Sequence, residues 1–504
     1  MPAEKTHPRA QLEAVDVAVV GAGPAGLAAA GAAAAAGKSV LLLDASAREG
    51  GQYWRHRPED VAAEAARPAW HHGWSTFLSL RERVDTARRH GRLTHLQSTQ
   101  VLSIDVHEDA GDFTLHTAAT PESQGPAGLR AVHAHTVVLA TGAYDRHLPV
   151  PGWTLPGVMA AGGIQAFIKT QGVAPGRRVL LAGTGPFLLA AAASVLRSGA
   201  EVAAVCESTD LTGWAPGGAT AALVPSKGAE GAEYAALLAR RRVPYRLRRV
   251  VTRILGAGRV EAVATAAVDR SGTLIPGTEE VYEDVDVVGL GWGFAPQTEL
   301  LLQTAARTRL DADGSLVGVV DARQESSVPG LFLAGELTGV TGAVGAVAEG
   351  RIAGASAAGR ASTGPATARE RTAAWADRAA RTRHRLFARA MHSAHPVPEG
   401  WQSWMSEDTT VCRCEEVPYG EVLDARDGLH LPDPRSLKGQ TRAGMGMCQG
   451  RMCGFALTCL TAGTDPAGPL RAEHARQVGV RPLSSPVALG AFLTSDDEPD
   501  RPRP

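Results

Sequence analysis

The chain has 504 residues, which is enough for two or three domains of ordinary size. Hydrophobic residues make up 44% of it and charged residues 20%, a mixture typical of a globular protein. The formal net charge of −1 gives no bulk electrostatic reason to expect nucleic acid or an anionic membrane as a partner. The polar N-terminus and the short apolar runs predict a cytoplasmic protein without a membrane span, associated with a membrane only through a complex.

The N-terminal part of the sequence follows the order strand, glycine turn, helix, strand, acid. An apolar run over residues 14–20 leads into a glycine motif over residues 21–26, and a second run over residues 40–43 ends at an acid. In such a unit the glycines permit a tight turn, close approach of a pyrophosphate and close helix packing, while the acid accepts hydrogen bonds from a ribose. The pattern predicts a dinucleotide site at Gly21, Gly23, Pro24, Ala25, Gly26 and Asp44.

Three further segments extend this pattern. A Gly-Gly-Gln turn follows the first acid, a strand-like run over residues 137–143 contains Ala-Thr-Gly, and the run over residues 331–336 ends in Gly-Glu. These segments resemble the FAD-contacting elements of flavoproteins with two dinucleotide-binding folds. The resemblance implies FAD as the cofactor, with a helix from about Gly342 facing the flavin and with Glu336 in place of the usual Asp at the ribityl chain. The additional contacts that it implies are Gly51, Gln52, Thr141, Gly142, Gly335 and Glu336.

A second glycine motif begins at Gly183 and repeats the order of the first, although Leu188 replaces its third glycine. An apolar strand over residues 201–205 leads to Glu207, an acid that favours a free 2′-hydroxyl over a 2′-phosphate. Gly183, Gly185 and Glu207 are therefore predicted to bind NAD(H) or another adenine nucleotide. A fold that has kept its shape without a ligand is the alternative.

The order of these segments predicts a discontinuous FAD-binding domain, because the second motif lies between parts of the first unit. The run over residues 286–296 is expected to be a strand that returns to the FAD-binding domain. Neither glycine-motif unit carries a redox cysteine pair, which argues against a dithiol reductase. The predicted divisions are 14–150 and 283–362 for the FAD-binding domain, 151–282 for the inserted nucleotide-binding domain, 363–404 for a helical linker, 405–470 for a cysteine-containing domain and 471–504 for a tail.

Four cysteines near the C-terminus fall into two pairs. Cys412 and Cys414 are separated by one residue, and Cys448 and Cys453 follow after residues 415–447. Four thiolates are the usual ligand set of a [2Fe–2S] cluster or of a structural zinc ion. The short first spacing and the glycines around the second pair favour the cluster, while zinc or free thiols stay open as alternatives.

The segments around these cysteines, Thr410–Val417 and Lys438–Gly446, carry a more specific resemblance. Together with the two glycine motifs they resemble the larger flavoprotein subunit of the hydrogen cyanide synthase, opine oxidase and hydroxyproline or proline dehydrogenase family, and part of the alpha subunit of heterotetrameric sarcosine oxidase. The resemblance spans about residues 14–465. It implies an α/β fold with a pair of Rossmann domains like glutathione or thioredoxin reductase. A small, mainly helical C-terminal domain similar to bacterioferritin-associated ferredoxin would hold the [2Fe–2S] cluster.

The same resemblance implies an electron-relay subunit of a heteromeric amine or amino-acid dehydrogenase or oxidase, passing electrons between flavin and cluster. The implied partners are an FAD-containing subunit that oxidises the amine or amino acid and a small ferredoxin-like subunit, and FMN at a subunit interface stays open. No residue of the sequence stands out as a catalytic base, which fits a relay. A self-sufficient NADH-dependent reductase and a scaffold that only holds a nucleotide are the two alternatives.

Overall fold

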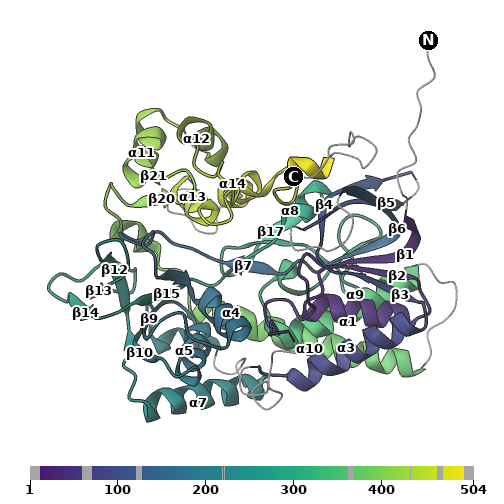
Figure 1. The fold of residues 1–504 in the computed structure, drawn as a ribbon, viewed down its shortest axis with the longest axis horizontal. Coiled ribbons are helices and arrows are strands. Elements are labelled where there is room, and N and C mark those ends of the chain that lie inside the picture. The colour runs from purple at the N-terminus through teal and green to yellow at the C-terminus, as the bar shows by residue number, and fades with distance from the viewer. Residues whose placement is uncertain are drawn as a thin grey trace, which may run out of the picture.

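The computed structural model describes residues 12–58, 71–109, 111–120, 128–217, 220, 222–360, 368–431, 433–461 and 469–492. Two α/β units lie side by side, and a mainly helical C-terminal part lies across one edge of both (Figure 1). In the part of the chain that is described, no helix is both long and apolar enough to cross a membrane.

The first unit is built on a seven-stranded sheet. The order of the strands is β3-β2-β1-β6-β5-β4, and β19 pairs with β6. The central strands are parallel and apolar on both faces, as expected for a sheet that helices cover on one side and further strands on the other. The strands are β1 (Leu12–Val20), β2 (Val40–Leu43), β3 (Leu93–Leu96), β4 (Thr99–His107), β5 (Asp112–Ala119), β6 (Leu129–Leu139) and β19 (Leu331–Leu333).

Three helices of this unit, α1 (Pro24–Ala35), α3 (Trp74–Arg89) and α9 (Gly342–Arg360), lie on one face of the sheet (Figure 1). Helices α1 and α9 pack almost backbone to backbone. A side chain at Gly350 or Gly354 would collide with the carbonyl oxygen of Ala25 or Ala29. This close approach brings the N-terminal ends of α1 and α9 to the same cavity, which Pro24 and Gly342 both line.

The second unit has a five-stranded parallel sheet in the order β11-β10-β9-β15-β8. Helices α4 (Ala161–Gln171), α5 (Phe187–Arg197) and α7 (Pro225–Arg240) belong to it, with the 3-10 helix η2 (Leu211–Gly217) after β10. A three-stranded antiparallel sheet packs beside it. The strands are β8 (Val158–Ala160), β9 (Arg178–Gly183), β10 (Glu201–Glu207), β11 (Tyr245–Leu247) and β15 (Val287–Gly291), with β12 (Arg249–Leu255), β13 (Ala262–Ala267) and β14 (Glu280–Glu283) in the smaller sheet.

One expected strand lies in the other sheet. The run over residues 286–296 was expected to return to the FAD-binding domain, and this was wrong, because β15 pairs in parallel with β9 and β8 of the second sheet. All five residues of β15 are buried, so its apolar character suits either sheet and does not identify the neighbour. The chain passes back only afterwards, where β16 (Phe294–Pro296) pairs with β7 (Ala143–Asp145) as a two-stranded ribbon between the units.

The C-terminal part begins with the long helix α10 (Ala368–Ala394), which packs against α9 through the partly buried ion pair of Arg385 with Glu349 (2.8 Å). The cysteine-containing segment shares a hydrophobic core with the second unit, and the indole of Trp153 donates to the carbonyl of Thr410 (2.6 Å). The remaining elements are α8 (Glu299–Gln303), β17 (Thr308–Leu310), β18 (Leu316–Gly318), η3 (Gly335–Thr338), η4 (Glu399–Trp404), β20 (Thr410–Cys412), β21 (Val417–Pro418), α11 (Tyr419–Leu423), η5 (Asp424–Gly428), α12 (Pro434–Thr441), α13 (Gly454–Thr461), α14 (Pro469–Gly479) and η6 (Leu489–Phe492).

Candidate functional site

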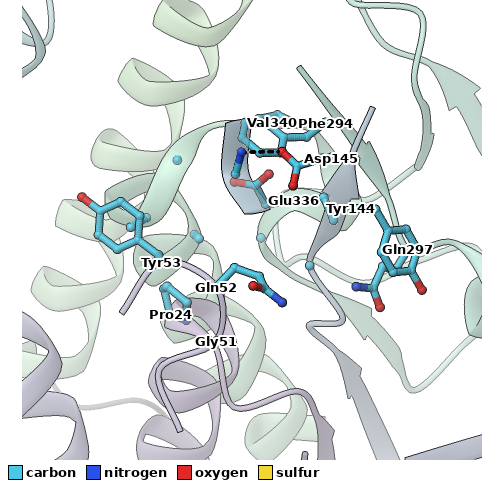
Figure 2. Close-up of a pocket in the computed structure, with 18 of the residues that line it drawn as sticks. Pro24, Gly51, Gln52, Tyr53, Tyr144, Asp145, Phe294, Gln297, Glu336 and Val340 are labelled. Carbon is cyan, nitrogen blue, oxygen red and sulfur yellow. Dashed lines mark hydrogen bonds between the residues drawn. The ribbon is translucent and has the colours of Figure 1, made fainter. Parts of the chain in front are cut away.

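A cavity of about 840 Å³ lies between the two α/β units and reaches the cysteine-containing segment. Its lining combines the first glycine turn, the end of β2, the Ala-Thr-Gly segment and the start of α9. Figure 2 shows Pro24, Gly51 and Gln52 in the lower part of the view and Asp145 and Glu336 above them. Of the residues predicted to bind FAD, only Gly26 does not line it, and Gly185 of the second motif lines its other end. The predicted residues in the lining are Gly21, Gly23, Pro24, Ala25, Asp44, Gly51, Gln52, Thr141, Gly142, Gly335, Glu336 and Gly185.

The first glycine turn has the close contacts that a dinucleotide site needs. Gly21 has a φ of 102°, and a side chain there would collide with the carbonyl of Ala140. A side chain at Gly26 would collide with the carbonyl of Gly21, so Gly26 holds the helix against the strand and does not face the cavity. The bare backbone of Gly23 at the N-terminus of α1 leaves N–H groups and the positive end of the helix dipole available for a phosphate.

Asp44 lies at the end of β2 and lines the same cavity. Its Oδ2 accepts a hydrogen bond from the N–H of Ala22, and its Oδ1 accepts one from the N–H of Ser46 (2.6 Å). Only 9% of the residue is exposed. These bonds fix the carboxylate beside the glycine turn, where each oxygen still has a lone pair for a ribose hydroxyl.

Glu336 is a partly buried carboxyl at the opposite wall of the cavity (Figure 2). Burial raises its pKa to about 7, helped by the charges of Glu349 and Asp313. Glu349 supports this wall, because its Oε2 accepts hydrogen bonds from the N–H of Gly335 (2.9 Å) and the hydroxyl of Thr338 (2.8 Å). A carboxyl that is partly protonated near neutral pH can both donate a hydrogen bond to a ligand hydroxyl and accept one from it.

Two lining residues that the sequence analysis did not select, Tyr144 and Asp145, come directly after the Ala-Thr-Gly segment. Burial raises the pKa of Asp145 to about 6, and its Oδ1 accepts a hydrogen bond from the N–H of Gly162 at the start of α4 (3.2 Å). Burial also raises the pKa of Tyr144 to about 12. Their position within a polar run after a buried strand was the available sequence signal.

The acid of the second glycine motif is closed off by the chain itself. Glu207 is 1% exposed, and its carboxylate accepts hydrogen bonds from the N–H of Gly185 (2.8 Å) and the hydroxyl of Thr209 (2.9 Å). His395, which follows α10, lies 3.7 Å from the same carboxylate and also accepts a hydrogen bond from the indole of Trp214 (3.0 Å). Gly183 and Glu207 do not belong to the described lining of the cavity, so of the three predicted residues of the second motif only Gly185 faces it, together with its neighbours Thr184, Pro186 and Phe187.

The four predicted cysteines come together in the structure, and each cysteine of the first sequence pair contacts one cysteine of the second. Cys412 contacts Cys453, and Cys414 contacts Cys448. The thiol of Cys453 and the N–H of Gly444 (3.4 Å) donate to the sulfur of Cys412 and lower the pKa of Cys412 to about 5. Among the residues that the structure describes, no group of three or more His, Cys, Asp or Glu side chains is arranged to hold one metal ion.

Arg451 connects the second cysteine pair to the cavity. It lies between Cys448 and Cys453 in the sequence and lines the cavity. Its Nε donates to the hydroxyl of Tyr144 (2.7 Å) and pairs with Glu299 (2.9 Å). Its Nη1 donates to the carbonyl oxygen of Cys448 (3.2 Å). Sequence analysis did not identify Arg451, because its cavity-wall partners Tyr144 and Glu299 are more than a hundred residues distant in the chain.

Comparison with known proteins places this geometry in a family. Residues 15–361 match the family described as pyridine nucleotide-disulphide oxidoreductase. The chain is 33% identical to an opine oxidase subunit of Rhizobium meliloti, over 94% of this chain and 97% of the relative. It is 30% identical to hydrogen cyanide synthase subunit HcnB of Pseudomonas aeruginosa, over 86% of this chain and 90% of the relative.

The solved structure of L-proline dehydrogenase from P. horikoshii has a similar fold. It superposes with a TM-score of 0.64 at 19% identity, covering 96% of this chain and 80% of that one. At this identity the similarity concerns the fold alone. The family match spans the lining segments between Val20 and Ala346, and it agrees, as do the two relatives, with the resemblance that the sequence motifs predicted. The chain therefore belongs to the pyridine nucleotide-disulphide oxidoreductase family, as an FAD-dependent oxidoreductase of the kind that its opine oxidase and hydrogen cyanide synthase relatives represent.

Proposed function

We propose that this protein is the electron-relay subunit of a heteromeric amine or amino-acid dehydrogenase or oxidase, with FAD in the cavity and a [2Fe–2S] cluster on the four cysteines. The observation that carries the proposal is the contact of Arg451 with Tyr144, since it joins the cysteine-containing loop to the cavity wall. In such an assembly the flavin supplies two-electron chemistry and the cluster supplies one-electron chemistry.

The proposal that FAD occupies the cavity rests on residues at its two ends, which suit different parts of the FAD molecule. The backbone of Gly23 and the carboxylate of Asp44 suit the pyrophosphate and the adenosine ribose, and Glu336 suits a hydroxyl of the ribityl chain. Residues 14–150 and 283–362 would together form this binding unit, although β15 within the second range pairs in the other sheet. Thr141, Gly142, Gly51, Gln52 and Gly335 would complete the contacts.

The arrangement of the thiols supports a cluster with two iron ions over a single zinc ion. A structural zinc needs its four ligands around one centre, whereas the hydrogen-bonded contacts among these cysteines join Cys412 to Cys453 and Cys414 to Cys448. Two irons with two cysteines each use four ligands in this way. Gly446 lets the second cysteine-containing segment approach the first closely, since a side chain there would collide with Cys414.

The geometry around Glu207 in the second nucleotide fold favours an electron-relay subunit and disfavours a self-sufficient NADH-dependent reductase. A dinucleotide would need the carboxylate of Glu207 for its ribose, and that residue is only 1% exposed, with His395 lying 3.7 Å from the carboxylate. His395 and Trp214 cover the same end of β10. A nucleotide held there without turnover, or none at all, fits this geometry better than NAD(H).

Partner subunits are part of the proposal because of the relatives, whose names describe them as subunits. The expected partners are a subunit that binds its own FAD and oxidises the amine or amino acid, and a small ferredoxin-like subunit. Cys414 is exposed and Met447 is 84% exposed, so the cysteine site lies at a surface that another protein can reach. FMN held between two chains would also be compatible with such an interface.

An NADH assay of the purified holoprotein alone separates the relay from the self-sufficient reductase. The protein should not oxidise NADH with ferricyanide as the electron acceptor, while photochemically reduced protein should pass its electrons to the same acceptor. Rapid NADH oxidation by the isolated chain would overturn the relay. The variant Trp214→Ala serves as a matched control, since it opens the region over Glu207 and shows whether that covering prevents NADH from binding.

A further inference from the structure

Beyond the residues proposed for flavin, the cavity is lined by residues of α4, α5 and α7, such as Gln165, Ser194 and Tyr234. We call this part of the cavity the recess. Lys169 of α4 lines this recess and is 8% exposed. Its Nζ donates to the carbonyl oxygen of Tyr53 (2.8 Å) and to Oε1 of Gln165 (3.1 Å). Both acceptors are neutral, so the ammonium is hydrogen-bonded but its charge is not balanced by them.

No carboxylate of the described chain forms an ion pair with Lys169, and the charged group that most affects it is Arg55, which is also positive. The other lysine in the lining, Lys227, differs in this respect, because it pairs with Glu230 at 2.8 Å. Burial lowers the pKa of Lys169 to about 8, so the ammonium is still mostly protonated at pH 7. A buried charge without a counter-ion is costly, and an anion would relieve that cost.

Three aromatic side chains line the recess, beside the ion pair of Lys227 with Glu230. The ring of Tyr53 lies 5.6 Å from the Nζ of Lys169, and the rings of Tyr234 and His72 meet edge to face at 5.5 Å. All three side chains line the cavity. Figure 2 shows that Tyr53 lies at one end of the pocket and that Tyr144 and Gln297 lie at the other. The recess is therefore separated from the wall that contacts the cysteine-containing loop.

We propose that this recess is a binding site for the oxyanion group, a carboxylate or a phosphate, of a small ligand whose remainder packs against Tyr53, Tyr234 and His72. Lys169 supplies the charge and its remaining N–H, because two of its three donors already have acceptors. This site adds a ligand to the proposed function. It rests on that function, because the recess opens into the cavity proposed for flavin. It would let an anionic metabolite bind beside the flavin of a relay subunit.

Thermal unfolding of the full-length holoprotein tests this site with simple probes. The unfolding midpoint is measured at pH 7 in inorganic phosphate, in acetate and in chloride at equal ionic strength, for the parent, Lys169→Met and Lys227→Met. Ligand binding to the folded state raises the midpoint. The parent and Lys227→Met should be stabilised by phosphate or acetate relative to chloride, and Lys169→Met should lose this difference. The anion that stabilises the parent identifies the source as a phosphate or a carboxylate.

Bound FAD is quantified in the same samples, which separates the two proposals. An equal anion effect in all three proteins, or none in the parent, would overturn the recess as an oxyanion site. A loss of FAD from Lys169→Met alone would overturn it too, because Lys169 would then belong to the flavin site. If the parent itself contains no FAD, the proposed function fails while the anion effect still reports on the recess. If Lys169→Met does not fold, Lys169→Gln replaces it, since its amide retains a hydrogen-bond donor without the charge.

Discussion

The Nε of Arg451 donates a hydrogen bond of 2.7 Å to the hydroxyl of Tyr144. This bond joins a residue between two cysteines to a residue of the ribbon that links the two α/β units. Glu299 lies on the same side and accepts from both Arg451 and Arg481 at 2.9 Å. The cysteine-containing loop is thus fixed to the cavity wall by a partly buried network of charges.

Replacement of Arg451 should test this connection. Arg451→Met leaves Glu299 with Arg481 as its remaining ion-pair partner, so we expect a loss of about 1–3 kcal/mol in unfolding free energy, less than for a fully orphaned buried charge. Flavin should remain bound, because Arg451 is not among the residues proposed to hold it. Denaturant unfolding of Arg451→Met, Glu299→Gln and the double variant measures the coupling between the two side chains.

The matched control for this cycle is Arg442→Met. Arg442 belongs to the same segment and pairs with Glu415, but 70% of its side chain is exposed, so its loss should cost less than about 1 kcal/mol. Additive effects of the Arg451 and Glu299 substitutions would contradict a direct connection between the loop and the cavity wall.

The cysteine pairs make a specific prediction about metal content. Replacing Cys412 and Cys414 with serine should remove iron and acid-labile sulfide while FAD remains, because each proposed iron loses one of its two thiolates. Cys459→Ser is the control, since Cys459 is buried on α13 and makes no contact with the four cysteines that the structure describes. Iron that persists unchanged in the double variant would refute the ligand assignment.

The two acids that follow the glycine turns should differ in their effect on flavin. Asp44→Asn removes the charge and one acceptor at the first turn, so we expect FAD affinity to fall by about 10-fold or more, as for a hydrogen bond to a charged group. Glu207→Gln makes the same change at the second turn and should leave flavin content normal. Flavin released on dilution is measured by its fluorescence, and equal losses from both variants would argue against the first turn as the flavin site.

Stability should depend on pH through Asp145. Its pKa is raised by burial from the usual 3.8 to about 6, so the folded chain keeps this proton over a range in which the unfolded chain releases it. The parent therefore loses stability between about pH 4 and pH 6, and Asp145→Asn should be more stable above that range by on the order of 1–3 kcal/mol. The Asn oxygen can still accept from Gly162. Apoprotein unfolding at pH 4 and pH 8 measures this, and an equal difference at both values would exclude Asp145 as the cause.

The sequence was sufficient to predict the features that depend on local order along the chain. The glycine turn at Gly21 and the acid at Asp44 follow from strand, turn and helix signals, and the structure places both at one cavity. The spacing of the cysteines predicted one site for Cys412 and Cys448; the structure brings the two cysteine-containing segments into contact, and the shared ligand set stays a prediction. Each of these patterns is written in a short segment, so it can be read without knowledge of the tertiary structure.

Features that depend on contacts between residues far apart in the chain could not be predicted from the sequence. The neighbour of β15 is decided by packing between sheets, which its uniformly apolar sequence does not encode. Burial without a counter-ion at Lys169 and the covering of Glu207 by His395 arise only when segments far apart in the chain meet. Nothing in the local sequence distinguishes Lys169 or His395 from ordinary surface residues.

The relay is tested by the cofactor content of the anaerobically purified full-length protein. Flavin, iron and acid-labile sulfide are quantified together with the visible spectrum. The relay predicts flavin bands and a broad sulfide-to-iron absorption, with about two irons and two sulfides for each FAD. Flavin without iron, or zinc in its place, would contradict the relay and make the cysteine-containing segment a structural element.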